Sequence, residues 1–320
     1  MNRRDLLKNA AFFGGGVALM RLLPESVLQA YAQAPRAGAP ADPLAAMRAQ
    51  MAATPIEVTK LTDTLTMLSG PGGNVAVLNG PDGKVVVDTF VQGAFAPLKQ
   101  RLDAMGNARI THAIDTHWHF DHADNNESFT KLKATLVAHE NTRKRLSEPH
   151  ELLGMHFNPA PSAAMPTQTF TQSHTLRANG EQLDLAYIPP AHTDTDIYIH
   201  FAHGNVLHLG DVFFNGMYPF IDAGTRGNIN GMIAGADRGL KLADPRTKII
   251  PGHGPLGDRA ALTRYRDVLV TVRDRVQKLK TSGRTEKDVI AAKPTADLDA
   301  VWGKGFLMPD QFVGIVYNTL

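Results

Sequence analysis

Hydrophobic and polar positions divide the chain into runs with two different periods. Residues 56–91 and 176–213 contain short apolar or alternating stretches, which are typical of β-strands. Glycine- and proline-rich turns interrupt the first region at residues 69–73 and 79–83. Helical spacing predicts helices over residues 95–105, 123–132, 229–242 and 259–279, and a short helix over 44–52. Sheets flanked by outer helices indicate an α/β fold in which two sheets pack between helical layers, a four-layer αβ/βα sandwich.

A dense group of ligand-type side chains follows one of the predicted strands. Residues 110–115 are apolar and β-branched, and they lead into His117, His119, Asp121 and His122. The alternation places His117, His119 and Asp121 on one face of an extended segment, at the carboxyl end of the strand. Open α/β sheets place their sites there. Imidazole and carboxylate are ligands of zinc and similar metals. The alternative is a set of surface histidines in a polar loop.

Three later strands also end in a metal-type residue. His192 follows a strand and a proline break, Asp211 follows a strand and a glycine, and His253 follows a strand, Pro251 and Gly252. Each would be an ordinary turn residue if it stood alone. Because the pattern recurs beside the first cluster, we expect all seven residues to converge on two metal ions. A two-metal site commonly activates water for hydrolysis.

The order of these motifs resembles the metallo-β-lactamase superfamily over residues 56–320. The resemblance rests on four motifs: His-x-His-x-Asp-His at 117–122, the isolated His192, Leu-Gly-Asp at 209–211 and Pro-Gly-His-Gly at 251–254. The resemblance implies the superfamily's αβ/βα sandwich and two Zn²⁺ ions, with iron or manganese as alternatives. It assigns the ligands as follows: His117, His119 and His192 to the first metal, Asp121, His122 and His253 to the second, and Asp211 as a bridge.

Three residues are candidates for roles beyond metal binding. Asp88 matches the strand-end aspartate of the superfamily and is expected to orient loops of the site rather than bind metal. Asp121 is expected to help orient the attacking water. Tyr218, shortly after Asp211, is a candidate donor to a developing oxyanion. The alternative for Tyr218 is a packed aromatic side chain.

The substrate is weakly specified by the resemblance. The expected reaction is water attack on an ester, lactone, thioester or amide. In the most similar β-lactamases a cysteine stands at the position of Asp211, and a lysine stands three residues later, where this chain has Phe214. These departures favour a lactonase or glyoxalase type of site and leave at most weak β-lactamase activity, although Asn228 resembles a β-lactamase element. Residues 150–172 form either an apolar lid or a surface excursion.

Two other functions compete with hydrolysis. The first is an iron-dependent oxidoreductase of the same superfamily, similar to the persulfide dioxygenases, which hold one iron. The complete second-metal set weakens that alternative. The second is a binding or scaffolding protein without chemistry, and the intact set of ligands argues against it.

The first 34 residues resemble a twin-arginine export signal. Arg3 and Arg4 precede an apolar stretch that is interrupted by three glycines, and small-x-small cleavage sites end at Ala32 and Ala34. An uncleaved membrane anchor is the alternative. We therefore expect a signal over 1–34, a linker over 35–54 and one catalytic domain over 55–320. The expected location is periplasmic or secreted, with the twin-arginine export machinery as a partner.

Composition narrows the chemistry and the partners. The chain of 320 residues has no cysteine, so it forms no disulfide and offers no thiolate to a metal. Its net charge is +2, and the surplus lies in the first 34 residues, so the rest is near neutral. Nonspecific nucleic-acid binding needs a basic face. A small-molecule substrate is therefore expected, and nucleic acid is not.

Overall fold

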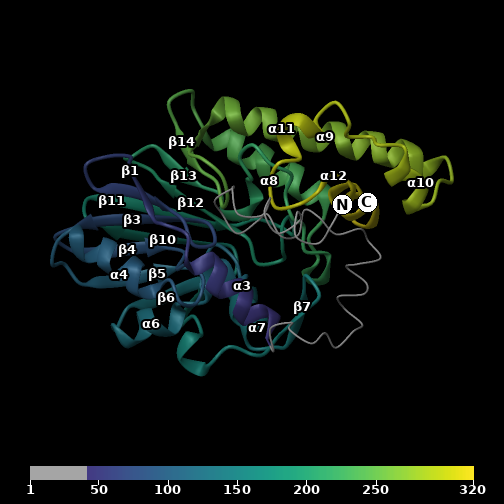
Figure 1. Ribbon diagram of the computed structural model, residues 1–320. Helices are drawn as coiled ribbons and strands as arrows, with labels where there is room; N and C mark the ends of the chain where they lie inside the picture. The colour runs from purple at the N-terminus through teal and green to yellow at the C-terminus, as the bar shows by residue number, and fades with distance from the viewer. Residues whose placement is uncertain (1–41) are drawn as a thin grey trace, which may run out of the picture.

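Two β-sheets form the centre of the computed structural model, which describes residues 42–320 (Figure 1). The first sheet has the order β1-β2-β3-β4-β5-β6-β9. It is antiparallel from β1 to β4 and parallel from β4 to β9. Its strands are β1 (Glu57–Lys60), β2 (Leu65–Ser69), β3 (Asn74–Gly80), β4 (Gly83–Val87), β5 (Ile110–Ile114), β6 (Thr135–His139) and β9 (Gln168–Phe170).

The second sheet has the order β10-β11-β12-β13-β14-β15. Its pairs are antiparallel except for β13 and β14, which run parallel. The parallel pair brings two carboxyl ends to the same edge of the sheet, and Asp211 and His253 follow these ends. The strands are β10 (Ser173–Ala178), β11 (Glu181–Tyr187), β12 (Ile197–Phe201), β13 (Val206–His208), β14 (Lys248–Ile250) and β15 (Gly257–Asp258).

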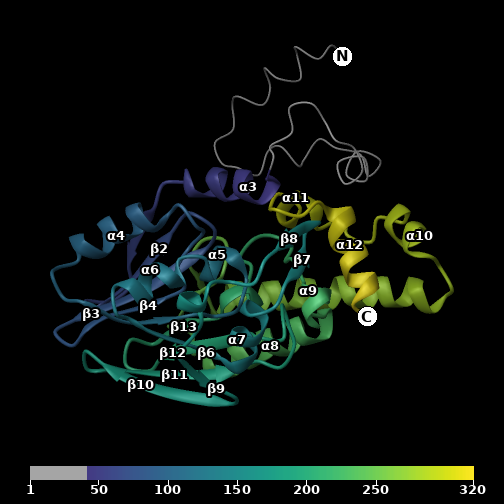
Figure 2. The same ribbon diagram turned by 90° about the horizontal axis from the view of Figure 1, so that it is seen from below.

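Strand alternation creates three separate apolar layers. In β3, Ala76 and Leu78 face the second sheet, whereas Val75 and Val77 face the outer helices. The inner layer joins the two sheets through residues such as Phe201. One outer layer lies beneath α4 (Phe95–Ala104) and α6 (Asn126–Lys131), and the other beneath α8 (Ile229–Leu242) and α9 (Arg259–Thr281). The predicted four-layer sandwich is confirmed, with α4 and α6 on one side of the strands and α8 and α9 on the other (Figures 1 and 2).

The helix predicted over 123–132 is wrong in its bounds. The chain forms α5 (Phe120–Ala123) and then α6. The side-chain amide of Asn125 donates to the backbone carbonyls of Thr89 and Val91, at 2.6 and 2.8 Å. These bonds hold the chain in a turn between the two helices. The break therefore anchors the metal-type motif to the loop after β4.

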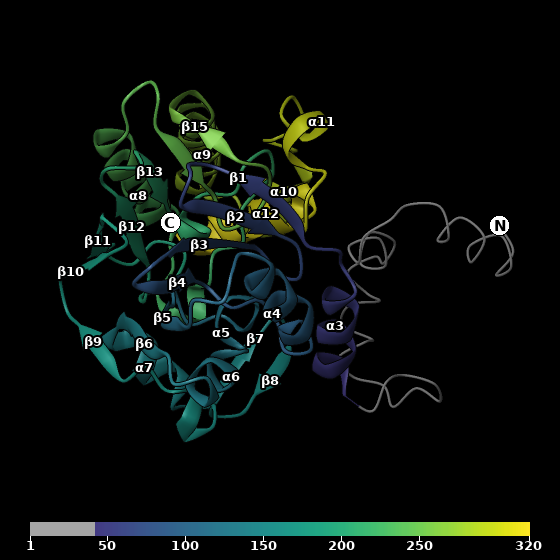
Figure 3. The same cartoon turned by 90° about the vertical axis from the view of Figure 1, so that its left-hand side faces the viewer.

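The predicted short helix near the N-terminus is present as α3 (Pro43–Ala52). Figure 3 shows it on the outside of the first sheet, beside α4 and β8. Arg48 donates to both carboxylate oxygens of Asp124 at 2.6 Å, and its guanidinium lies 5.8 Å from the ring centroids of Phe120 and Phe157. The predicted signal over 1–34 and the first part of the linker lie outside the described residues. None of the helices within residues 42–320 combines the length and the hydropathy of a membrane-spanning segment.

Two peripheral parts complete the fold. After α7 (Glu140–Leu146), the segment 150–172 contains a hairpin of β7 (His150–Leu152) and β8 (Met155–Phe157), the short helix η2 (Ser162–Ala164) and β9. The chain ends in α10 (Glu286–Ala291), α11 (Asp299–Trp302) and α12 (Pro309–Asn318), which were not predicted. Phe312 and Val316 of α12 are buried in the apolar layer beneath α9. The C-terminal helices are therefore part of the domain.

We predict that Arg48→Ala lowers the free energy of unfolding by about 1–3 kcal/mol, because it leaves the largely buried Asp124 carboxylate without its charged partner. Urea unfolding of residues 42–320 measures the change. Arg264→Ala is the matched control, because Arg264 is exposed. Equal stability of the two variants would show that α3 is not anchored through Arg48.

Candidate metal centre

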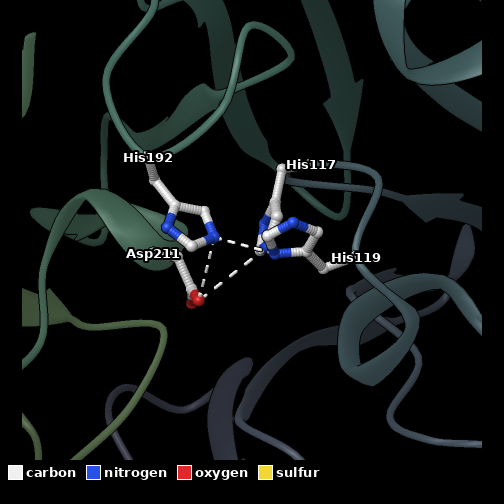
Figure 4. Close-up of side chains that lie close together, drawn as sticks. All are labelled: His117, His119, His192 and Asp211. Carbon is white, nitrogen blue, oxygen red and sulfur yellow. Dashed lines mark hydrogen bonds and ion pairs between the residues drawn. The ribbon is translucent and has the colours of Figure 1, made fainter. Parts of the chain in front are cut away.

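Seven side chains converge where the strands of both sheets end. They fall into two groups in which ligand atoms lie within 4.8 Å of one another. The first group is His117, His119, His192 and Asp211, and the second is Asp121, His122 and His253. Figure 4 shows the first group: the imidazoles of His117, His119 and His192 and the carboxylate of Asp211 point toward a common point. The structure thus brings together every ligand candidate chosen from the sequence.

Hydrogen bonds fix the direction of the imidazole lone pairs in the first group. His119 donates from Nε2 to Asp222 at 3.1 Å, and His192 donates from Nδ1 to the carbonyl of Phe220 at 2.8 Å. The remaining nitrogens, Nδ1 of His119 and Nε2 of His192, face each other at 2.9 Å. Two lone pairs at that distance repel, so the arrangement requires a proton or a cation there.

His117 has the same geometry. Its Nδ1 lies 3.0 Å from the Thr116 hydroxyl, and that hydroxyl donates to Asp88 at 2.9 Å. Nδ1 of His117 is therefore the donor, and Nε2 carries the lone pair. This Nε2 is buried and has no hydrogen-bond partner in the described structure. Three imidazoles thus present three lone pairs to one point, as a metal ion requires.

Asp211 joins the first group to the second. Its Oδ2 lies 3.4 Å from Nε2 of His192 and 3.2 Å from Nε2 of His253. Its Oδ1 lies 3.2 Å from Nε2 of His122, but no N–H of the described residues is aligned on it. One carboxylate therefore faces both groups. This geometry agrees with the bridging role that the resemblance implies for Asp211.

The second group is built in the same way. Nδ1 of His122 donates to Asp88 at 2.8 Å, so its Nε2 is free to bind a metal. That atom lies 3.4 Å from Nε2 of His253, and Oδ2 of Asp121 lies 3.3 Å from the same atom of His253. Oxygen and nitrogen donors at these spacings suit divalent zinc or a similar ion. The buried Nε2 of His117 and Oδ1 of Asp211 have no hydrogen-bond partner within residues 42–320, which also fits a site for metal ions.

Burial and neighbouring carboxylates shift the pKa values of the histidines in the centre in opposite directions. Burial lowers the pKa of His192 to about 4 and holds the pKa of His117 well below its usual range. Burial would also lower the pKa of His253, but Asp211 and Asp121 raise it to about 9. Burial would likewise lower the pKa of His122, but nearby carboxylates raise it. Without a metal, the second group is therefore held together by the attraction between protonated histidines and carboxylates. A metal ion would replace that positive charge.

Asp88 takes the orienting position expected for it. It directly follows β4 and has a positive φ of 65°, and its carboxylate accepts from the Thr116 backbone N–H, the Thr116 hydroxyl and His122. One residue thus orients both imidazoles that flank the bridge, through His122 directly and His117 by way of Thr116. Gly252 is needed for a different reason, since a Cβ there would lie 1.9 Å from Oδ1 of Asp211.

Sequence reasoning missed Asp222. It lies in the loop before η4 (Ala223–Thr225), and no motif marks it. Burial would raise its pKa, but the hydrogen bond from His119 lowers it to about 2, so the carboxylate is ionised. Its Oδ2 also accepts from the hydroxyl of Thr225. An outer carboxylate of this kind fixes the tautomer of the histidine that it contacts.

Tyr218 is not brought together with the seven ligand candidates. Its hydroxyl donates to Asp299 at 2.9 Å, and its ring stacks on Phe312 with centroids 4.6 Å apart. Burial raises the pKa of Tyr218 above its ordinary value. This placement supports the packed aromatic alternative over a role as oxyanion donor.

Two further residues were singled out in the sequence. The ring of Phe214 stacks on that of His253 with centroids 5.1 Å apart, and Asn228 caps α8 by accepting from the backbone N–H of Gly231.

Comparison with known proteins agrees with the fold and the motifs. Residues 68–267 match the family described as "Metallo-beta-lactamase superfamily". The chain belongs to the metallo-beta-lactamase superfamily. No curated protein matches it.

Several solved structures resemble the chain at low sequence identity. A metallo-beta-lactamase from Pontibacter korlensis is 18% identical with a TM-score of 0.56, over 67% of this chain and 98% of that one. The DIM-1 metallo-beta-lactamase is 18% identical with a TM-score of 0.54, over 68% and 98%. The stereoselective inverting sec-alkylsulfatase Pisa1 from Pseudomonas sp. is 16% identical with a TM-score of 0.65, over 82% of this chain and 50% of that one. These likenesses show a shared fold.

We predict that Asp222→Ala weakens metal binding by about 10- to 100-fold, because His119 loses the acceptor that fixes its tautomer. Asp222→Asn should fall between this variant and the parent, since its amide oxygen can still accept. Zinc competition against a chromogenic chelator measures the affinity. Asp63→Ala, at a fully exposed side chain, is the control. Unchanged affinity in Asp222→Ala would remove Asp222 from the centre.

We also predict that the metal-free protein is most stable near pH 6.5. The raised pKa of His253 contributes stability that is fully present below about 6.5 and is lost as the pH rises through about 9. The lowered pKa of His192 acts oppositely, and its contribution is lost as the pH falls from about 6.5 toward 4. Urea unfolding of chelator-treated protein should show a loss of about 1–3 kcal/mol between pH 6.5 and 9.5.

The variant His253→Gln removes the contribution of His253 to the alkaline part of this profile, whereas His122, whose pKa Asp211, Asp121 and Asp88 also raise against the effect of burial, still contributes. Glutamine does not titrate, so the loss between pH 6.5 and 9.5 should be smaller in the variant than in the parent. The same loss in both proteins would assign the alkaline effect to another group.

Proposed function

We propose that the protein is a hydrolase that holds two divalent metal ions, with zinc as the first choice, and cleaves an ester, lactone, thioester or amide. The observation that carries the proposal is the pair of ligand groups joined by the carboxylate of Asp211. His117, His119 and His192 would hold one ion, and Asp121, His122 and His253 the other. Metal ions bound there supply Lewis-acid polarisation of a carbonyl oxygen and a lowered pKa for a water molecule.

The more exposed side of the centre indicates the direction from which a substrate would arrive. The side chains of His253 and Asp121 are 22% and 11% exposed, whereas that of Asp211 is 4% exposed and that of His192 is fully buried. Substrate therefore reaches the centre past His253 and Asp121. The deeper imidazoles of His119 and His192 are held in place by Asp222 and the carbonyl of Phe220.

Asp121 is the proposed proton carrier at this opening. Burial would raise its pKa, but His122 and His253 lower it, so the carboxylate is ionised and can accept a proton. Its Oδ2 faces Nε2 of His253. We place Asp121 beside the attacking water, where it orients that water and accepts its proton before passing it to the leaving group.

The residues around His253 argue against efficient β-lactam hydrolysis. Phe214 stacks on the imidazole of His253 at an interplanar angle of 15°. Its ring occupies the position where the most similar β-lactamases carry a lysine, and an aromatic ring cannot bind the carboxylate of the drug. We therefore propose weak β-lactamase activity at most.

The iron-dependent oxidoreductase is not favoured. The second group is complete and is oriented through Asp88, which a one-iron enzyme does not require. The similar structures are described as β-lactamases and an alkylsulfatase, and hydrolysis is the chemistry that these names share. We further propose export to the periplasm or the exterior through the twin-arginine machinery. The support is the Arg3-Arg4 segment with the apolar stretch that follows it.

The test is hydrolysis of a panel of chromogenic esters, thioesters, lactones and a cephalosporin by the zinc-loaded protein. We expect turnover of at least one carbonyl substrate, loss of turnover with chelator, and recovery with zinc. His119→Ala should reduce kcat/KM by at least the roughly 10- to 100-fold that loss of an outer partner costs. It should also reduce the metal content measured by elemental analysis.

The same panel can overturn the proposal. Bound iron at one ion per chain with oxygen consumption would replace hydrolysis by redox chemistry. Normal metal content and turnover in His119→Ala would remove the assigned centre from the reaction.

A further inference from the structure

His253 is held differently from the other histidines of the metal centre. In each of the others, the ring nitrogen that faces away from the metal site contacts an oxygen atom of the protein. Within residues 42–320, the polar contacts of the His253 imidazole all involve Nε2, which faces His122 and the carboxylates of the centre. Its ring is otherwise positioned by stacking on Phe214. The direction of its lone pair therefore depends on the backbone that carries it.

Asn74, the first residue of β3, binds that backbone from the first sheet. Its side-chain amide donates to the carbonyls of Pro251 and Gly254, each at 2.9 Å, and its backbone N–H donates to the carbonyl of Gly252 at 2.9 Å. An NH₂ group has the two hydrogens that the side-chain bonds require. The three bonds bracket His253, because they reach the two residues before it and the residue after it. Asn74 is 2% exposed, so its loss would leave carbonyls without a partner in a buried place.

The second sheet holds the same loop from the other side. The backbone N–H of Asn215 donates to the carbonyl of His253 at 2.9 Å, and that of Gly252 donates to the carbonyl of Gly210 at 2.7 Å. The loop thus lies between two sets of hydrogen bonds. Without the side chain of Asn74, it is fixed mainly from the second sheet.

The turn before Asn74 lies against the other two ligand candidates of the second group. A Cβ at Gly72 would lie 2.8 Å from the Cβ of Asp121, and a Cβ at Gly73 would lie 3.3 Å from Nε2 of His122. Glycine at these positions lets the backbone approach the ligands closely. Residues 72–74 therefore lie against all three side chains that would hold the second metal.

We propose that Asn74 is a positioning residue that holds His253 in place for the second metal. The inference rests on the proposed function, because it concerns the ion that Asp121, His122 and His253 would hold. The outer contacts of the first group come from other segments of the chain. Loss of the Asn74 amide therefore weakens the binding of the second metal and leaves that of the first unchanged.

The first test is stepwise zinc binding, measured by competition with a chromogenic chelator. Asn74→Ala should weaken the binding of the second zinc by about 10- to 100-fold, as loss of an outer contact does, and leave the first unchanged. Asn74→Asp should have the same effect, because an ionised carboxylate of similar size has no hydrogen to donate. Asn79→Ala is the matched control, since Asn79 lies near the other end of β3 and donates to the carbonyl of Met105 at 2.8 Å. It should change neither affinity.

Two results of the zinc titration would overturn the inference. Equal weakening of both zinc ions in Asn74→Ala and Asn74→Asp would assign Asn74 a general structural role. Unchanged affinity for the second zinc would show that His253 does not depend on Asn74.

Amide hydrogen exchange of chelator-treated protein separates this inference from the proposed function. Asn74→Ala should accelerate exchange of the N–H groups of Asn215 and Gly252 by at least about 10-fold and leave the amides of β4 unchanged, whereas Asn79→Ala should not accelerate these two. Acceleration shared by the amides of β4, or none at Asn215 and Gly252, would overturn the positioning of His253.

The two proposals can fail separately. Selective loss of the second zinc in Asn74→Ala, without turnover of any substrate in the panel by the parent, would support the role of Asn74 and overturn the hydrolase alone. If the parent holds a single ion, the two-metal proposal is overturned, and the exchange pattern still decides whether Asn74 positions His253.

Discussion

The structure depends on fixed imidazole lone pairs directed at two neighbouring points. The orienting contacts come from two distant parts of the chain: Asp88, directly after β4, and the loop that carries the carbonyl of Phe220 and the carboxylate of Asp222. These acceptors hold nitrogens of like polarity as close as 2.9 Å, which is unfavourable unless a positive charge lies between them. The strand ends, the positive φ of Asp88 and the close approach of Gly252 all serve that arrangement.

The sequence predicted the parts of the fold and site that have a local signature. The His-x-His-x-Asp-His segment is contiguous, and the other ligand candidates each follow an apolar strand, so their convergence could be inferred from the rule that strands deliver residues at their carboxyl ends. The bounds of α8 agree with the helical spacing. The break between α5 and α6 was missed because it depends on contacts of Asn125 with a loop more than thirty residues away.

Other features could not be predicted because they exist only in the folded chain. Asp222 is one of many loop aspartates until His119 donates to it. The anchoring of α3 depends on the pairing of Arg48 with Asp124, 76 residues apart. A cavity of about 850 Å³ likewise forms between the β7–β8 hairpin and α12, two segments that carry no shared motif. Charge that lies in separate helices becomes one electrostatic environment only through tertiary packing.

The parallel pairing of β13 and β14 has a consequence for assembly. It places Asp211 and His253 on the second sheet, whereas His117, His119, Asp121 and His122 follow a strand of the first sheet. Each metal ion would therefore be held by residues from both halves of the sandwich. In a chain without cysteine, the two ions would act as cross-links between the sheets. Tight binding would then report that both halves have folded and docked, which couples metal loading to the last step of folding.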